Sequence, residues 1–167
     1  MRKERNTLKL ILFNLDALAA GIALVLAMLL LNANIIMRHV FTRPLLWVQE
    51  AVAGLLLWAI FLGGAYVYRR GANLNSNMVV NRFSSGNRFL VKLMVDFLVI
   101  LSLAALTYGG ILYVSRFMGE VMPMLGFPRF YVDGAIPCGF GLAFLYAVFF
   151  FLRDLLTAEV RKGDEDE

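Results

Sequence analysis

The chain has almost none of the residues that build redox, haem and zinc sites. Among its 167 residues there is one cysteine, Cys138, and one histidine, His39. One cysteine excludes an internal disulfide and a CxxC motif within the chain, and one histidine excludes haem ligation by two histidines of the same chain. There is also no phosphate-binding glycine loop, catalytic triad or metal-binding motif. We therefore expect that the chain is not an enzyme and holds no cofactor or metal.

Charge is scarce as well. Charged residues make up 17% of the chain and hydrophobic residues 60%, and the mean hydropathy is +0.73. Soluble domains, by contrast, carry about 25% charged residues. This composition is typical of an integral membrane protein, which is surrounded by lipids and has no nucleic-acid partner.

Four apolar segments are long enough to cross a membrane, since a spanning helix needs about 20 such residues. They cover approximately residues 10–37, 45–68, 89–115 and 134–152. Little sequence lies outside them, so we predict an all-α integral membrane protein with four transmembrane helices. Residues 1–167 would form a single membrane domain that ends in a tail, 153–167. The first segment is too long for a cleavable signal peptide and is expected to remain.

The basic residues predict which side of the membrane each end faces. Of the sixteen lysines and arginines, twelve lie in the N-terminal segment, around the connection between the second and third spans, and in the C-terminal tail. Positive charge is enriched on the cytoplasmic side of membrane proteins. We therefore predict that both termini are cytoplasmic and that the first and third connections lie outside.

Proline and glycine mark the predicted helix ends. Pro44 is suited to the first turn of the second helix. Arg69, Arg70 and Gly71 are expected to end that helix, with cations near the negative end of its dipole. The following stretch, 72–88, is interpreted either as a short amphipathic helix on the cytoplasmic surface or as an ordinary polar linker.

The third connection, 116–133, is unusually apolar for an exposed loop. Pro123 and Pro128, with Gly126 between them, exclude a continuous helix there. The methionines and aromatic residues of the loop indicate that it lies against the membrane interface or is covered by another protein. Pro137 then falls in the first turns of the last span, where a missing amide is tolerated or a kink forms.

The stretch 34–50, which joins the first two spans, gathers charge at the edge of the bilayer, where charge is costly. Glu50 is expected about two turns inside the second helix, and Arg38, at the matching end of the first helix, is its candidate partner. The pair is interpreted either as an ion pair that fixes two helix ends or as a contact to a second membrane subunit. His39 is expected to be a surface residue, and Trp47 an interfacial aromatic residue.

Three more charged side chains lie near the ends of the spans. Asp16 is a candidate coupling carboxylate for a proton-driven carrier, but its depth also suits a helix N-terminus that faces water. Asp96 lies four residues after Lys92, so these two are expected to pair near the surface. No acidic residue lies in the middle of a span, which argues against a small proton-driven multidrug exporter.

Small residues are concentrated in the spans, while no internal repeat is visible. Because small side chains let helices approach closely in lipid, they predict tight packing between helices. The absence of a repeat weakens the interpretation as a self-contained transporter, since many transporter folds are built from repeats. The small residues include Gly54, Gly63, Gly64, Gly109, Gly110, Gly139 and Gly141.

In their order along the chain, these features resemble the small membrane subunit (DctQ-like, or Q) of tripartite ATP-independent periplasmic (TRAP) transporters. In the run RHVFTRPLLWVQE, from Arg38 to Glu50, an arginine, a phenylalanine, a proline, a tryptophan and a closing glutamate have the same spacing as in that family. The similarity covers about residues 30–150. Other stretches that are similar to the family are Phe61–Gly71, Pro123, Gly126–Pro128 and Ile136–Gly139.

The chain departs from the family at two places. Gln49 and Glu50 stand where the family often has two adjacent acidic residues. After the double arginine the family commonly has a charged residue or a histidine and then an acidic residue, whereas residues 72–77 here read ANLNSN and are neutral. Because of these departures, the resemblance does not predict the contacts at the cytoplasmic surface or the subfamily to which the chain belongs.

The resemblance implies a non-catalytic subunit of the bacterial inner membrane. In that family a large permease subunit carries the sodium and substrate sites and moves as an elevator. The small subunit enlarges the fixed scaffold and helps to dock a soluble periplasmic binding protein, and the imported substrates are organic acids such as dicarboxylates, sialic acids and sulfonates. Structural or partner contacts are expected from Arg38, Trp47, Glu50, Arg69, Arg70, Pro123, Pro128 and Pro137.

Two other classes of protein remain open from the residues alone. A self-sufficient four-helix carrier would couple transport through Asp16 or Glu50. An assembly protein of a membrane redox complex would hold a haem or a quinone, although the ligands for one are missing from this sequence.

Overall fold

The computed structural model describes the backbone of residues 14–43, 45–80 and 88–163, and the side chains of 14–43, 45–71 and 91–156. Over these ranges it contains four long helices and one short helix, and the four are long and apolar enough to span a membrane. This confirms the predicted all-α, four-span fold. The helices are α2 (Leu15–Val40), α3 (Leu46–Val80), α4 (Arg88–Arg116), α5 (Phe130–Asp133) and α6 (Ala135–Gly163).

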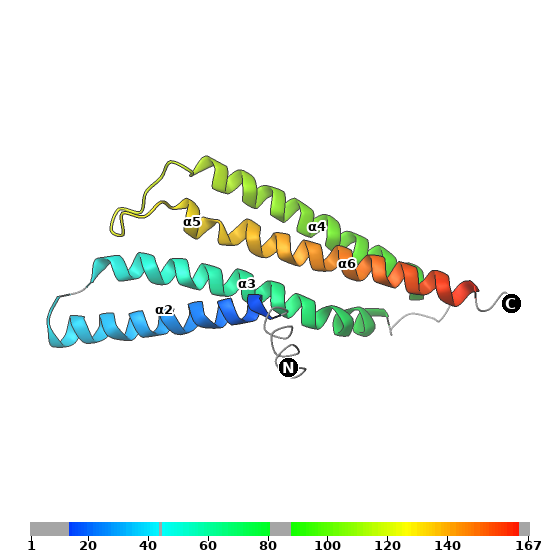
Figure 1. Ribbon diagram of the computed structural model, residues 1–167, viewed down its shortest axis with the longest axis horizontal. Coiled ribbons are helices and arrows are strands. Elements are labelled where there is room, and N and C mark those ends of the chain that lie inside the picture. Colours follow the sequence, from blue (N-terminus) through cyan, green and yellow to red (C-terminus); the bar gives the residue numbers. More distant parts are fainter. Residues whose placement is uncertain (1–13, 44, 81–87, 164–167) are drawn as a thin grey trace, which may run out of the picture.

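The long helices lie side by side in a row whose order is α2, α3, α6, α4 (Figure 1). α3 packs against α2 on one side and α6 on the other, and α4 packs mainly against α6. One end of the row holds the α2–α3 connection and the loop 117–129, and we call it the hairpin end. The opposite end holds the start of α4, and we call it the terminal end; α2, with Asp16 in its first turn, begins short of this end (Figure 1).

Small side chains line the contacts between these helices, while most large apolar side chains face outward. The buried apolar residues are alanines and valines, whereas many leucines, isoleucines and phenylalanines are more than 40% exposed. In lipid this arrangement is favourable, since the bilayer solvates large apolar groups and close backbone approach maximises van der Waals contact. The buried set is Ala20, Ala23, Ala27, Val48, Val52, Ala65, Val114, Ala135, Ala143 and Ala147.

α3 does not end at Gly71, as the sequence predicted, but continues to Val80. Residues 72–80 include no proline, and a glycine inside a helix costs only about 1 kcal/mol relative to alanine, so nothing in the sequence forces a break. Of the amphipathic segment expected over 72–88, the first nine residues therefore belong to α3. The part at 81–87 lies outside the described residues, as does Pro44.

α6 likewise extends beyond the predicted span, to Gly163, so most of the expected tail is helical. Residues 10–13 of the first predicted span and residues 164–167 lie outside the described part. Pro137 is the third residue of α6, as predicted, where its missing amide is tolerated.

The loop between α4 and α5 is compact rather than helical, which confirms the effect predicted for its prolines. Val121 and Pro128 form an antiparallel bridge. Gly126 has φ +66°, a left-handed conformation that favours glycine, and its amide donates to the Met122 carbonyl oxygen at 2.9 Å. The loop therefore turns back toward α5 along its own first half.

The contact between α3 and α6 is closest at Gly139. A Cβ added there would lie 2.6 Å from Phe61 Cβ and 2.7 Å from the Phe61 carbonyl oxygen. We predict that Gly139→Ala forces the two helices apart and lowers the free energy of unfolding by about 1–3 kcal/mol. Thermal unfolding in mild detergent measures this change.

Gly64→Ala is the matched control, because a Cβ at Gly64 meets nothing within 4 Å. It should leave the melting temperature unchanged or raise it slightly, since alanine is the better helix former. Equal losses in the two variants would show that helix packing at Gly139 is not the cause.

Candidate functional site

The first polar cluster lies near the terminal end of the row and joins three helices. Arg69 of α3 donates to the Asp16 carboxylate of α2 at 3.0 Å, and Tyr146 of α6 donates its hydroxyl to the same carboxylate at 3.3 Å. Arg69 also donates to the Asn14 side-chain oxygen at 3.1 Å. We call Asn14, Asp16, Arg69 and Tyr146 the terminal cluster.

Both charges of the terminal cluster are almost completely buried. The side chains of Arg69 and Asp16 are 9% and 6% exposed. Burying an ion pair is favourable only when further hydrogen bonds satisfy it, and these are supplied here. The guanidinium lies 5.3 Å from the ring centres of both Tyr66 and Tyr146, which adds cation–π attraction.

The local sequence explains why Asp16 can occupy this position. It lies in the first turn of α2, where the helix dipole favours a negative charge, and it accepts a 3.0 Å hydrogen bond from the Ala17 amide. Asp16 was expected to face water or to act as a coupling group. In the structure its carboxylate instead accepts hydrogen bonds from Arg69 of α3 and Tyr146 of α6.

The second polar cluster lies at the hairpin end and centres on Glu50. Its carboxylate accepts hydrogen bonds from the backbone amides of Met124, at 3.1 Å, and Leu125, at 2.9 Å. Both amides belong to the apolar loop between α4 and α5. Glu50 therefore fixes this loop to α3, and we call Glu50, Met124 and Leu125 the loop latch.

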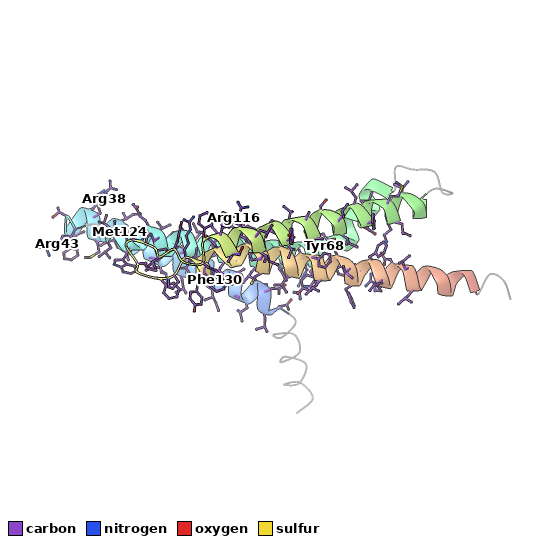
Figure 2. The ribbon with its side chains drawn as sticks, turned by 90° about the horizontal axis from the view of Figure 1, so that it is seen from above. Arg38, Arg43, Tyr68, Arg116, Met124 and Phe130 are labelled. Atoms are coloured by element: carbon purple, nitrogen blue, oxygen red, sulfur yellow. The ribbon has the colours of Figure 1, made fainter. Side chains whose placement is uncertain are left out.

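The predicted ion pair between Arg38 and Glu50 is wrong. Arg38, in the last turn of α2, is exposed, and it forms no ion pair or hydrogen bond with Glu50. Glu50 instead satisfies two amides that the tight turn of the loop leaves without backbone partners, which is a strong charge-assisted arrangement. Figure 2 shows Arg43 beyond Met124 along the long axis.

A network around Arg129 holds the rest of the loop against α5. Its guanidinium donates to Asp133 at 3.0 Å and Glu120 at 3.1 Å and lies 5.1 Å from the Phe117 ring centre. The negative charge of Asp133 raises the pKa of Arg129. Trp58 also donates its indole N–H to the Tyr131 carbonyl oxygen at 3.0 Å, so this tryptophan packs against another element rather than only against lipid.

The remaining expected contact residues lie at the surface of the chain. Arg70 is exposed and lies over the Tyr66 ring, 5.4 Å from its centre. Trp47 is 41% exposed near the start of α3, and Pro123 and Pro128 are exposed in the loop. His39 is exposed with its Nδ1 3.0 Å from the Ile35 carbonyl oxygen, which agrees with the predicted surface role.

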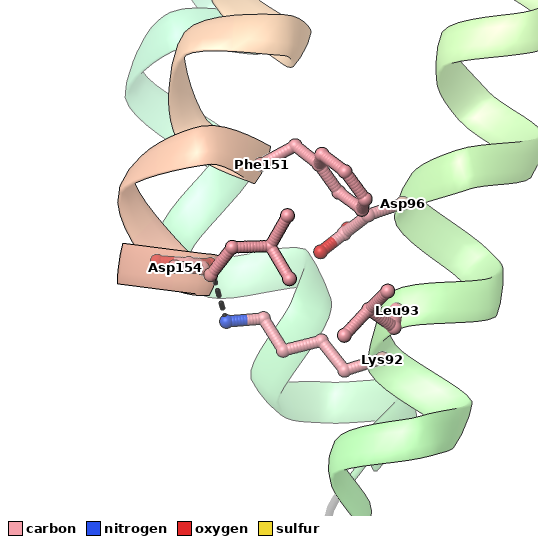
Figure 3. Close-up of a pocket in the computed structure, with 6 residues that line it drawn as sticks. Lys92, Leu93, Asp96, Phe151 and Asp154 are labelled. Carbon is pink, nitrogen blue, oxygen red and sulfur yellow. Dashed lines mark hydrogen bonds and ion pairs between the residues drawn. The ribbon is translucent and has the colours of Figure 1, made fainter. Parts of the chain in front are cut away.

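A third polar contact lies between α4 and α6, beside a small pocket (Figure 3). Lys92 donates to the Asp154 carboxylate at 2.6 Å, so its ion pair reaches across to α6 rather than staying on its own helix. Both side chains are about 30% exposed. The pocket is lined by Lys92, Leu93, Asp96, Phe151, Asp154 and Leu155.

These clusters tie helices and the α4–α5 loop together. Within the described residues, no three His, Cys, Asp or Glu side chains are grouped to hold a metal ion. Sequence reasoning found Asp16, Arg69 and Glu50 but missed Tyr146 and the loop amides. The hydroxyl of Tyr146 near the end of an apolar span was the one available signal, since a buried tyrosine needs a hydrogen-bond partner.

Comparison with known proteins gives two findings. Residues 27–157 match the family described as tripartite ATP-independent periplasmic transporters, DctQ component. The chain is also similar to the ectoine TRAP transporter small permease protein TeaB of Halomonas elongata, with 23% identity over 157 residues, which is 93% of this chain and 81% of TeaB. The family match includes Glu50, Arg69 and Tyr146, while Asp16 precedes it.

Removing one charge of the terminal cluster should be strongly destabilising. Asp16→Asn keeps the shape of the side chain but removes the negative charge that lies 3.0 Å from the buried Arg69 guanidinium, and we predict a loss of about 3 kcal/mol in the free energy of unfolding. Denaturant unfolding in detergent, followed by tryptophan fluorescence, measures the loss.

Asp154→Asn is the matched control for that substitution. It breaks the partly exposed pair with Lys92, which should cost less than about 1 kcal/mol. If the two variants unfolded at the same denaturant concentration, the buried pair would contribute no more to the free energy of unfolding than the partly exposed pair does.

Loss of the loop latch should free the loop without involving Arg38. We predict that Glu50→Ala speeds tryptic cleavage after Arg129, because the Met124 and Leu125 amides lose their acceptor, and that Arg38→Ala leaves the rate unchanged. The double variant should match Glu50→Ala alone. If Arg38→Ala were cleaved as fast as Glu50→Ala, the result would contradict the loop latch and support the ion pair between Arg38 and Glu50.

Proposed function

We propose a scaffold role for this chain, which belongs to the DctQ component family of TRAP transporters and is a small permease subunit of such a system. In the proposed role the chain is the fixed, non-catalytic part of a sodium-coupled importer of an organic acid. It supports a large elevator-type permease subunit, which would carry the sodium and substrate sites.

The observation that supports this role most directly is how the charged groups of the spans are used. Asp16 and Arg69 satisfy each other and Tyr146 in a buried site, and Glu50 is held by two loop amides. A carrier that coupled transport through Asp16 or Glu50 would have to break these contacts in each cycle. A scaffold needs them to stay formed, so the structure favours the scaffold over the self-sufficient carrier.

The hairpin end offers a surface for a soluble partner. Both termini are proposed to be cytoplasmic in the bacterial inner membrane, which places the loop 117–129 in the periplasm. Several of its large side chains are more than 40% exposed, although the latch holds the loop in one conformation. We propose that this surface helps to dock the periplasmic binding protein; the exposed residues are Met118, Val121, Met124 and Phe127.

The imported solute is recognised, in this proposal, by the binding protein and the large subunit. The name of TeaB assigns ectoine to its system. For the present chain we propose an organic acid, and uptake assays with the assembled system identify which one.

A scaffold should not transport alone. We predict that the chain purified in mild detergent brings down a much larger multi-span permease, and that liposomes with only this chain take up no solute above protein-free liposomes. Liposomes with both subunits and the binding protein should show sodium-dependent uptake. Uptake by the isolated chain that disappears in Asp16→Asn would contradict the scaffold role and support the carrier.

A further inference from the structure

One level can be traced across all four long helices, because neighbouring helices meet there at close contacts. We call it the shared level, and it runs through Ala20 on α2, Phe61 on α3, Phe140 on α6 and Thr107 on α4. Between α2 and α3, the Ala20 Cβ lies 3.7 Å from where a Cβ at Gly63 would be. Between α3 and α6, the ring centres of Phe61 and Phe140 are 5.2 Å apart. Between α6 and α4, the Thr107 methyl lies 3.7 Å from where a Cβ at Gly141 would be.

Charged residues lie at very different distances from the shared level on the two edge helices. On α2, Ala20 is only four residues from Asp16 toward the terminal end but eighteen residues from Arg38 toward the hairpin end. On α4, Thr107 is eleven residues from Asp96 and nine from Arg116. At 1.5 Å per residue, the charge-free part of α2 is therefore displaced toward the hairpin end by roughly 10–13 Å.

The displacement is an offset and not a difference in length. The charge-free stretches, 17–37 on α2 and 97–115 on α4, are each roughly 30 Å long, which matches the hydrocarbon core of a bilayer. Both ends of α2 are shifted in the same direction relative to α4, and Figure 1 shows the α2–α3 pair reaching further at the hairpin end.

A row standing upright in the membrane accommodates this offset poorly. If α4 were centred in the bilayer, the exposed Arg70, seven residues from Gly63 at the shared level, would lie roughly 5 Å inside the hydrocarbon. The exposed Arg38 and Arg43 at the other end would project far beyond it. A charged side chain costs about 2.5–3.5 kcal/mol at the centre of the hydrocarbon and less toward its edge, so the upright arrangement is unfavourable.

We propose that the row crosses the lipid bilayer tilted within its own plane, so that both membrane surfaces run obliquely across the four helices. The offset of 10–13 Å accumulates over three interhelical spacings of 8–10 Å, which gives a tilt of roughly 25°. Spanning helices tolerate tilts up to about 40°. Every charged end then reaches a membrane surface, and the outward-facing leucines and isoleucines of α2 and α4 lie in lipid or against a membrane partner.

The tilt does not depend on the direction of insertion or on the proposed transport role. It follows from the spans, the contacts at the shared level and the positions of the charges. For a scaffold subunit it means that the row presents a slanted face to any membrane partner.

Single spin labels measure the tilt directly. In the full chain with Cys138→Ala, reconstituted in phosphatidylcholine vesicles, we would label Leu18→Cys and Leu106→Cys, and separately Val25→Cys and Leu112→Cys. All four native side chains are exposed, and each pair lies at one height along the helices. The ratio of collision rates with oxygen and with a nickel chelate reports the depth of each label.

The tilt predicts that the deeper label is on α4 in the first pair and on α2 in the second. Leu106 should be deeper than Leu18 by roughly 10 Å, and Val25 deeper than Leu112 by roughly 5 Å, from their distances to the middle of each charge-free stretch. Equal depths within each pair would overturn the proposal, because they are what an upright row gives.

A second measurement needs no substitution. Polarised infrared absorption of the amide I band in oriented bilayers gives the mean angle between the helices and the membrane normal. An angle near 25° is expected for the unmodified chain, and an angle below about 10° would overturn the tilt even if the labelled variants failed to fold.

Discussion

A charge buried among membrane helices must find its counter-charge inside the protein, and the arrangement of this chain follows from that constraint. Asp16 and Arg69 are both nearly inaccessible and pair with each other, while Tyr146 donates its hydroxyl to Asp16 and places its ring beside the Arg69 guanidinium. Because the three groups come from α2, α3 and α6, their contacts hold these three helices together near the start of α2. The small side chains between the helices then set how closely the backbones approach.

At the hairpin end, too, a charged group finds its partner inside the protein, but the donors are backbone amides. Glu50 meets two backbone amides rather than a basic side chain, and Arg38 and Arg43 remain at the surface. The loop between α4 and α5 is thereby fixed to α3 while its apolar side chains stay exposed. A rigid loop with an exposed apolar surface is suited to a docking role, since little ordering entropy is lost when a partner binds.

Hydropathy was enough to predict four helices and the approximate limits of their spans, because the bilayer imposes the length of each apolar stretch. The partners of the charged groups were not predictable in the same way. Arg38 and Glu50 are close in sequence and looked paired, whereas the actual partners of Asp16 and Glu50 are 53 to 130 residues away. The order of the helices decides these contacts, and no residue in the sequence encodes that order locally. The end of α3 was misplaced because a double arginine followed by glycine is a common helix stop but not an obligatory one.

The scaffold role proposed for this chain requires a fixed distance between α2 and α6, which can be tested in the assembled transporter. Pulsed electron paramagnetic resonance between spin labels at Leu18 on α2 and Leu145 on α6, in the assembled complex with binding protein, measures one distance with and without sodium and substrate. A fixed scaffold gives one narrow distance distribution that is the same in all conditions. A shift of several ångströms when substrate and sodium are added would mean that the terminal cluster opens during transport, and would contradict the scaffold role.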